Sequence, residues 1–174
     1  MQYTTTCQSP LGELLLAADE KGLTGIWFDG GKYFAEGLDA EHEKGQLPVL
    51  ETAKNWLDIY FAGREPDFTP PLHMIGSPFR LSVWKHLLEI PYGETTTYGE
   101  IAKRIAREMG IERMSAQAVG GAVGHNPVSI IVPCHRVIGA DGSLTGYAGG
   151  LEKKVRLLTL EGVERISTWS KKSR

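Results

Sequence analysis

The chain opens with three short stretches of apolar and β-branched residues, at 3–7, 13–18 and 23–28. The residues between them, 9–12 and 19–22, are rich in turn formers such as proline, glycine and aspartate. Short stretches of this kind, separated by such turns, are typical of neighbouring antiparallel strands. The pattern therefore predicts a β-meander over the first 28 residues.

After a polar stretch at residues 29–47, the pattern becomes helical. Apolar residues recur at helical spacing between Pro48 and Gly63: Val49, Ala53, Trp56, Leu57 and Tyr60. This spacing predicts one amphipathic helix that covers one face of the sheet. Residues 63–78 contain four prolines and predict an extended linker, because proline cannot continue a helix.

Beyond the linker the chain predicts two further helices. Ser77 supplies a hydroxyl N-cap and Pro78 the first helical position. The buried face of this helix is predicted to hold Phe79, Val83, Leu87 and Ile90. Residues 91–93, Pro-Tyr-Gly, end it, and Thr97 and Glu100 fit a capping box at the start of the second helix.

A third short helix is predicted from Ser115 to Ala122, and its residues are unusually small. Gly120 and Gly121 each cost about 1 kcal/mol in a helix interior, so the pair needs a physical reason. Either another backbone or a nucleic-acid strand approaches this face, or the helix packs tightly against its neighbour. The order of these helices is typical of a helix-turn-helix unit.

The β-branched run at residues 130–132 predicts a short buried strand or extended segment. A glycine-rich loop at residues 139–150 lacks the spacing of phosphate-binding loops. Residues 151–161 predict the last helix, with Gly162 at its end. Glu161 falls near the edge of the apolar stripe of that helix, so its carboxylate should have a partner.

Composition and charge divide the chain in two. The 174 residues are 41% hydrophobic, enough for a packed core. The formal net charge of −2 hides an asymmetry, since residues 1–72 carry 5 basic and 12 acidic side chains, net −7, and residues 73–174 carry 14 and 9, net +5. The second part is therefore expected to bind a polyanion. No apolar run approaches the roughly 20 residues that span a bilayer, so we expect a cytoplasmic protein with no membrane partner.

These patterns together predict an α+β fold in four segments. They are a small N-terminal α/β domain at residues 1–72, a linker at 73–78, a mainly helical domain at 79–165 and a basic tail at 166–174. The boundary is placed near residue 72, where prolines cluster and the charge changes sign.

Cys134 is the candidate for chemistry, since a thiol beside a general base can act as a nucleophile. His135 is its neighbour in sequence, and Glu161 is available to orient that histidine. Pro133 should break strand pairing and expose the cysteine. A plain buried cysteine stays the alternative, and Cys7 is interpreted as one.

No metal site is expected. A zinc deaminase signature would need a cysteine at position 137, where Val137 stands, and the chain contains no C-x-x-C pair. With no secretory signal in the pattern, Cys7 and Cys134 are expected to be free thiols.

Several motifs of the second part occur together at characteristic spacings. They are Ile90-Pro91-Tyr92-Gly93, Thr97-Tyr98-Gly99, Ala118-Val119-Gly120-Gly121-Ala122, Asn126-Pro127, Pro133-Cys134-His135-Arg136-Val137 and Gly146-Tyr147-Ala148-Gly149-Gly150. This set closely resembles the O6-alkylguanine-DNA alkyltransferases, also called methylated-DNA-protein-cysteine methyltransferases. The resemblance covers residues 76–163 strongly and the N-terminal domain by layout.

The resemblance implies a ribonuclease-H-like N-terminal domain without a nuclease site, and a winged-helix domain whose helix-turn-helix enters the minor groove of double-stranded DNA. It implies that an alkyl group on O6 of guanine, or on O4 of thymine, passes to the cysteine after base flipping. The transfer would be irreversible, occur once per molecule and need no cofactor. We expect a monomer. A narrow groove would also explain the small residues of the third helix.

The resemblance also implies roles for single residues. Cys134 would accept the alkyl group, His135 would act as a water-linked base and Glu161 would orient that base. Asn126 would fix the active-site turn, and Tyr98 would donate a proton to the departing guanine. A further set would contact the DNA and the flipped base: Gln117, Tyr147, Ala148, Ser129, Ser115 and Gly121.

Two positions depart from the family pattern. Gln117 stands where relatives commonly carry an arginine that fills the gap left by the flipped base. We expect flipping to remain and the salt-dependent affinity to be weaker. Ser129 stands where some relatives carry proline, which predicts a roomier pocket that admits alkyl groups larger than methyl.

Three alternatives remain on sequence grounds. A non-catalytic alkyltransferase-like protein would flag lesions, but in such relatives the cysteine is replaced. An alkylation-sensing DNA-binding regulator would use alkylation of Cys134 as its signal, but residues 1–72 lack the zinc-binding cysteines of the activator domain fused to some relatives. A cysteine-histidine hydrolase would favour a cysteine at a helix N-terminus, which the pattern does not predict.

Overall fold

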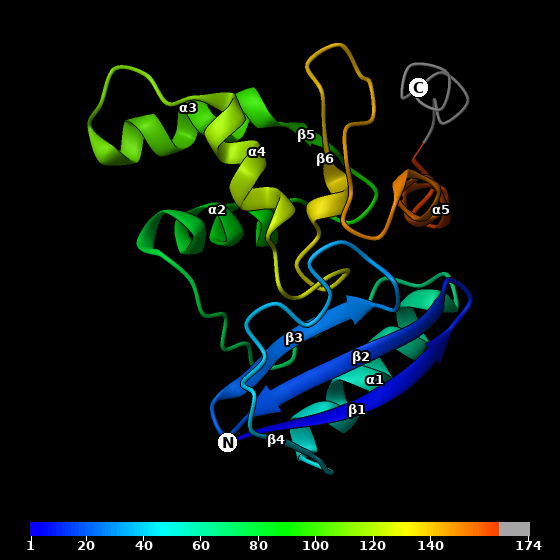
Figure 1. The fold of residues 1–174 in the computed structure, drawn as a ribbon. Helices are drawn as coiled ribbons and strands as arrows, with labels where there is room; N and C mark the ends of the chain where they lie inside the picture. The colour runs from blue at the N-terminus through cyan, green and yellow to red at the C-terminus, as the bar shows by residue number, and fades with distance from the viewer. Residues whose placement is uncertain (164–174) are drawn as a thin grey trace. The chain divides into compact units, whose positions relative to one another are not determined.

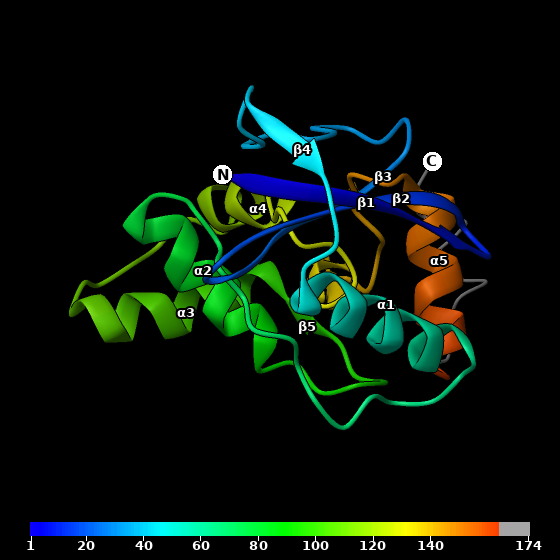
Figure 2. The same cartoon turned by 90° about the horizontal axis from the view of Figure 1, so that it is seen from below.

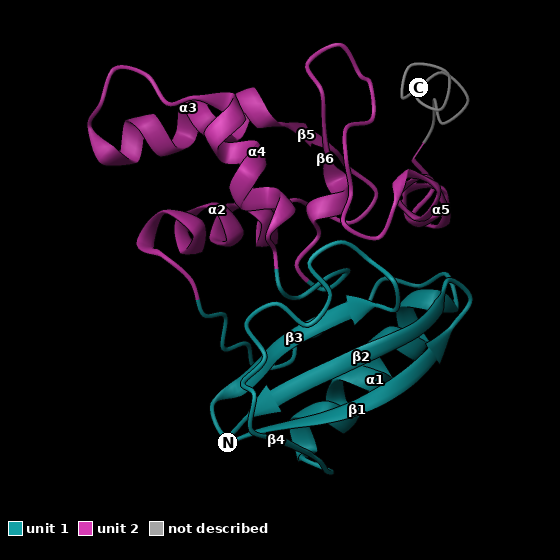
Figure 3. Ribbon diagram, viewed as in Figure 1, with its two compact units in different colours: residues 1–75, 127–131 teal, residues 76–126, 132–174 magenta. Residues whose placement is uncertain are grey.

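The structure is a computed structural model that describes residues 1–163, and the predicted basic tail at 166–174 lies outside the described residues. The chain forms two compact units (Figure 3), of which unit 1 comprises residues 1–75 and 127–131, and unit 2 residues 76–126 and those from 132 onward. The chain therefore enters unit 1 a second time. The sequence pattern instead assigns this returning segment, residues 127–131, to the helical domain.

The first three strands form the β-meander that the sequence predicts. They are β1 (Gln2–Ser9), β2 (Gly12–Asp19) and β3 (Gly22–Phe28), each paired antiparallel with the next. A fourth strand, β4 (His42–Lys44), pairs parallel with β1 and gives the sheet the order β3-β2-β1-β4. All three residues of β4 are exposed and polar, so the hydrophobic pattern carries no signal for this strand.

Helix α1 (Pro48–Phe61) lies across one face of the sheet and contacts β1, β2 and β3 (Figures 1 and 2). Proline at the first helical position and Glu51 in the first turn suit a helix N-terminus, where the amides are unpaired and the dipole is positive. Its buried face is the predicted one, with Leu50 in place of Val49: Leu50, Ala53, Trp56, Leu57 and Tyr60. Burial of each large apolar side chain contributes about 1.5–3 kcal/mol, so this face and the strands above it form the core of unit 1.

Two other segments cover the outer edge of β3. Leu23 pairs with residues 71–73 and Ile26 with residues 127–129, each through two backbone hydrogen bonds of 2.8–3.2 Å. An uncovered edge strand would present unpaired amides to other chains. The returning segment at 127–131 is therefore part of the sheet architecture of unit 1.

The β-branched run at residues 130–132 is buried, but it is not the strand that its composition predicts. The Ile131 amide donates to the Ser129 carbonyl at 2.8 Å, and Ile130 has a φ of +73°, so the chain turns sharply here. A positive φ is costly for a β-branched residue. The side chain of Ile130 is fully buried, and this packing holds the residue in a conformation that its own preference disfavours.

Unit 2 is built mainly from helices: α2 (Pro78–Leu88), α3 (Tyr98–Met109), α4 (Ala116–Gly124) and α5 (Leu151–Leu160). The first three begin at the predicted caps. The hydroxyl oxygens of Ser77, Thr97 and Ser115 each accept the amide of the residue three positions on, at 3.1–3.2 Å. These bonds satisfy helix amides that would otherwise have no partner.

Three further contacts organise this unit. The fully buried indole of Trp84, on α2, donates to the carbonyl of Ala122, on α4, at 2.8 Å. Helix α3 contacts both α2 and α4. A short parallel pair, β5 (Thr96–Thr97) and β6 (Val137–Ile138), joins the start of α3 to the segment after Cys134. Within residues 1–163 no helix is long and apolar enough to cross a membrane.

Candidate active site

Cys134 is the first residue of a single 3-10 turn, η1 (Cys134–Arg136). The carbonyl of Val132 accepts both the amide of Cys134 and the side-chain amide of Asn126, each at 2.8 Å. Asn126, two residues beyond α4, therefore ties the turn that carries the cysteine. The expectation that Pro133 exposes Cys134 is wrong, since the residue is only 7% exposed. The hydrogen bond from the Cys134 amide to the Val132 carbonyl closes a tight turn at Pro133, and the residue after this turn is buried.

The surroundings of the Cys134 thiol act on its pKa in opposite directions. Burial raises this pKa, whereas a hydrogen bond from the Asn126 side chain and the positive charge of Lys154 lower it. Lys154 lies on α5 and is fully buried, and its ammonium donates to the carbonyls of Val137 at 2.7 Å and Thr145 at 3.2 Å. Burial lowers the pKa of Lys154 to about 8, and the neighbouring cysteine opposes that shift. A buried thiol beside a buried ammonium can lose its proton at lower cost than an isolated one.

Glu161 has the partner that its place on the helical stripe predicts, and two more besides. Its Oε2 lies 2.6 Å from Nε2 of His135. Its Oε1 accepts Nε–H of Arg136 at 2.8 Å and the amide of Gly93 at 3.0 Å. Burial alone would raise the pKa of this carboxyl, but the hydrogen bonds from His135 and Arg136 and the positive charge of Arg136 lower it to about 2. Glu161 is therefore charged at neutral pH.

His135 is fully buried, and burial lowers its pKa more than Glu161 raises it. Its imidazole is therefore neutral near pH 7, and the counter-charge of Glu161 is the guanidinium of Arg136, which stays protonated in proteins. A carboxylate only accepts hydrogen bonds, so Nε2 of His135 carries the proton and Nδ1 has the lone pair. This is the protonation state that a general base requires.

Arg136 is one residue whose role the sequence pattern did not reveal. It donates to the carbonyl of Ile90 at 2.7 Å, and its guanidinium lies 5.7 Å from the centroid of the Tyr92 ring. Gly93 follows with a φ of +80°, and a Cβ there would meet the Glu161 carbonyl oxygen at 3.2 Å. The Pro-Tyr-Gly segment, predicted as a helix stop, therefore also supplies contacts to the buried charges. The sequence does hold one indication of this contact, because the Pro-Tyr-Gly segment and the His-Arg pair belong to the same set of motifs.

Tyr98 and Tyr147 are brought to the site from different elements. Tyr98, at the start of α3, accepts a hydrogen bond on Oη from the hydroxyl of Thr145 at 2.6 Å. Tyr147 lies edge-on to the ring of His135, with centroids 6.5 Å apart. Ala148 follows it, half-buried. The glycine-rich loop between β6 and α5 thus contributes neighbours to both Tyr98 and His135.

The predicted contact residues of α4 lie at the surface. Ser115 caps the helix, and Gln117 and Gly121 are exposed. A Cβ at Gly121 would have no atom within 4 Å among the described residues, and one at Gly120 would meet the Tyr98 ring at an ordinary 3.7 Å. Packing within unit 2 therefore does not require either glycine. The expectation that a nucleic-acid strand approaches this face stays a prediction.

Ser129 differs from the other predicted site residues, because it lies in unit 1. Its amide donates to the carbonyl of Ile26 at 3.2 Å, and the residue is buried. This contact belongs to the edge of β3. The predicted place of Ser129 in a pocket wall stays a prediction.

The state of the cysteines and the possibility of a metal site also bear on the chemistry. Cys7 and Cys134 are both free thiols. Within the described part of the chain, no three histidine, cysteine or acidic side chains gather in a way that could hold a metal ion.

Comparison with known proteins extends over both units. Residues 2–74 match the sequence model of the 6-O-methylguanine DNA methyltransferase ribonuclease-like domain, and residues 78–163 match that of the DNA binding domain of the same proteins. A methylated-DNA-protein-cysteine methyltransferase of Methanosarcina acetivorans is 48% identical over 160 residues, which are 92% of this chain and 98% of the relative. One of Haemophilus influenzae is 42% identical over 165 residues, 94% of this chain and 88% of the relative.

A solved structure agrees with these matches. The crystal structure of Mycobacterium tuberculosis OGT in complex with DNA matches with a TM-score of 0.77 at 42% identity, over 97% of this chain and 99% of that one.

Replacing Glu161 tests the buried charge network. Glu161→Gln should lower the free energy of unfolding by about 3 kcal/mol near neutral pH, because it leaves the buried guanidinium of Arg136 without a counter-charge. The folded-state pKa of Glu161, about 2, lies below its ordinary value of 4.5. The stabilisation should therefore be complete above about pH 4.5 and be lost as the pH falls toward 2. Urea unfolding of both proteins across this range measures the difference.

Glu152→Gln is the matched control, because Glu152 lies on the first turn of α5 and is exposed. It should change the free energy of unfolding by less than about 0.5 kcal/mol. A difference between wild type and Glu161→Gln that stays constant as the pH falls below about 4 would contradict the charge-based account.

Proposed function

The chain belongs to the 6-O-methylguanine DNA methyltransferase family, and from this membership we propose that it repairs DNA by moving the alkyl group of O6-alkylguanine to its own Cys134. The observation that carries the proposal is the placing of a free thiol beside a neutral histidine and a charged glutamate, all buried together. The histidine is in the neutral state that removal of the thiol proton needs, and the charged glutamate can stabilise the imidazolium that then forms.

The first step is loss of the thiol proton. The lone pair on Nδ1 of His135 takes it, through a water molecule, while Glu161 stabilises the resulting imidazolium through Nε2. Lys154 and Asn126 favour the thiolate that remains on Cys134. A thiolate is the nucleophilic form of cysteine, so this step controls the reactivity of the site.

The second step is displacement at the alkyl carbon. The sulfur of Cys134 forms a bond to that carbon as the bond from carbon to O6 breaks, and the electron pair of the broken bond stays on guanine. Tyr98 donates its phenolic proton to the departing base and so neutralises the developing charge. The product is a thioether, which thiol exchange does not reverse, so each molecule acts once. O4-alkylthymine carries the same kind of alkyl-oxygen bond, and the proposal extends to it.

Base flipping is part of the proposal. Cys134 is only 7% exposed, so a guanine stacked inside a duplex would not reach its sulfur. An extruded base would instead be held beside Tyr147, whose ring lies against His135. Flipping is therefore the route by which the alkyl carbon comes within reach of the thiolate.

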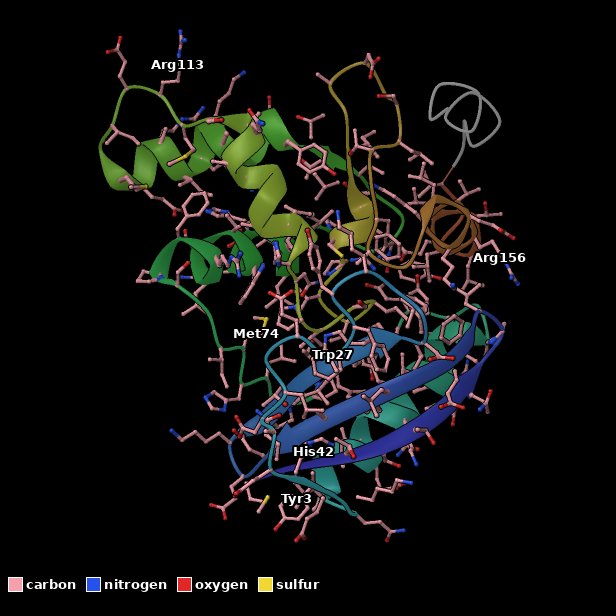
Figure 4. All side chains as sticks on the ribbon, viewed as in Figure 1. Tyr3, Trp27, His42, Met74, Arg113 and Arg156 are labelled. Atoms are coloured by element: carbon pink, nitrogen blue, oxygen red, sulfur yellow. The ribbon has the colours of Figure 1, made fainter. Side chains whose placement is uncertain are left out.

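The surface of α4 suits the duplex. Its exposed small residues allow a helix to enter a narrow groove. A cavity of about 450 Å³ lies beside its N-terminus, lined in part by Lys103, Arg107 and Arg113. Arg113 projects outward from the segment between α3 and α4 (Figure 4). In the proposal these cations hold phosphates, contacts that position DNA without reading its sequence.

Intact mass measurement tests the proposed function. After incubation with a duplex oligonucleotide that contains O6-methylguanine, the wild-type protein should gain one methylene per molecule, and the gain should map to the peptide that contains Cys134. Cys134→Ala should gain nothing. Cys7→Ala, which removes the other thiol, should gain as much as wild type. No gain in wild type, or a gain that maps to Cys7, would overturn the proposal.

Restoring the missing charge on α4 tests the predicted effect of Gln117. Gln117→Arg should tighten binding to duplex DNA and steepen the dependence of log K on log salt by about 0.9, the value for one additional phosphate charge neutralised. Titration of a labelled duplex at several salt concentrations measures both quantities. Gln46→Arg adds the same charge to an exposed position in unit 1 and serves as the control. If affinity and slope were unchanged in Gln117→Arg, position 117 would not lie at the DNA.

A further inference from the structure

The hydroxyl of Thr145 lies against the phenol of Tyr98. The two residues are 47 positions apart in sequence, and Thr145 Oγ1 donates to Tyr98 Oη at 2.6 Å. Thr145 belongs to the glycine-rich loop between β6 and α5, and Tyr98 begins α3. No motif in the sequence pattern gave Thr145 a role.

We propose that Thr145 is a positioning residue for alkyl transfer, which directs the phenolic proton of Tyr98 toward the departing base by donating a hydrogen bond to its oxygen. This inference rests on the proposed function, in which Tyr98 is the proton donor. Thr145 itself touches neither the thiol nor the base in this account.

The 2.6 Å contact between the two hydroxyl oxygens supports this role, with Thr145 assigned as the donor. A phenol has one proton to donate and lone pairs that accept. When Oη of Tyr98 accepts from Thr145, the phenolic proton must point elsewhere, and the structure gives Tyr98 Oη no second partner among the described residues. The proton is therefore available to a group that arrives from outside the chain, as a flipped base does.

The anchoring of Thr145 supports it independently. Its carbonyl accepts from the buried ammonium of Lys154, which also bonds the carbonyl of Val137. An ammonium that lost these oxygens would be buried without hydrogen-bond partners, at considerable cost. Lys154 therefore fixes the backbone at residue 145, although glycines at 142 and 146 make the loop permissive. The same lysine favours the Cys134 thiolate. One buried positive charge therefore both stabilises the nucleophile and anchors Thr145, the hydrogen-bond partner of Tyr98.

The acidity of Tyr98 responds to the same hydrogen bond. Burial raises the pKa of Tyr98, and the hydrogen bond from Thr145 opposes that shift. A donor aimed at the phenolic oxygen stabilises the negative charge that forms when Tyr98 gives up its proton. Thr145 is exposed in the free protein, where water competes with the bond. A bound duplex would exclude that water and strengthen the effect.

A double-mutant cycle tests the inference, with the rate of methyl transfer from an O6-methylguanine duplex measured under saturating, single-turnover conditions. Thr145→Val keeps the shape and removes the hydroxyl, and it should slow transfer about 5-fold, the effect of one hydrogen bond. Thr145→Ser, which keeps the hydroxyl, should transfer at nearly the wild-type rate. In a Tyr98→Phe background, Thr145→Val should cause no further loss.

Matched measurements separate positioning from a structural role. Thr145→Val should leave the DNA affinity, the free energy of unfolding and the reaction of Cys134 with iodoacetamide unchanged. Thr159→Val removes an exposed hydroxyl from α5, which bonds only the Val155 carbonyl among the described residues, and should transfer at the wild-type rate.

The outcomes distinguish this inference from the proposed function. Wild-type transfer with an equal rate in Thr145→Val would overturn the inference alone. So would a loss from Thr145→Val that is as large in the Tyr98→Phe background as in the wild-type background. Absence of transfer by wild type would overturn the proposed function and this inference with it.

Discussion

The buried negative charge of Glu161 is the constraint on which the rest of the site depends. Its carboxylate is held by the adjacent residues His135 and Arg136 of η1 and by the amide of Gly93, from the segment between α2 and β5. A buried carboxylate without such partners is costly, so the groups are fixed relative to one another. Because Arg136 supplies the counter-charge, His135 stays neutral and can act as a base. In the proposed function, the ability of His135 to take the thiol proton thus depends on a charge that does not touch the sulfur, while Lys154 and Asn126 act on the thiol itself.

Local rules predict the elements whose residues are patterned by burial or by capping. Ser77, Thr97 and Ser115 mark helix starts because a short hydroxyl side chain satisfies a free amide wherever it occurs. Strand β4 escaped prediction because its residues are exposed and its pairing with β1 is made by the backbone. The turn at Ile130 escaped because tertiary packing imposes a conformation that the residue type disfavours.

The site residues also divide into those that the sequence pattern predicts and those that only the folded structure reveals. Cys134, His135 and Glu161 belong to residue types that carry chemistry, and the motif around them is distinctive, so the sequence was enough to single them out. Arg136 and Lys154 were missed because a charged side chain is by default a surface residue. Their burial depends on acceptors elsewhere, the carbonyl of Ile90 for Arg136 and that of Val137 for Lys154. Only the folded chain shows that these carbonyls are available.

The protonation state of His135 tests the central claim most directly. Nitrogen NMR of isotope-labelled protein, with the His135 signals assigned by comparison with His135→Asn, distinguishes the two neutral tautomers from the imidazolium. We predict a neutral ring with its proton on Nε2 at about pH 7.5, since burial holds its pKa below the ordinary 6.5. A His135 ring that is charged at neutral pH, or that carries its proton on Nδ1, would contradict the account.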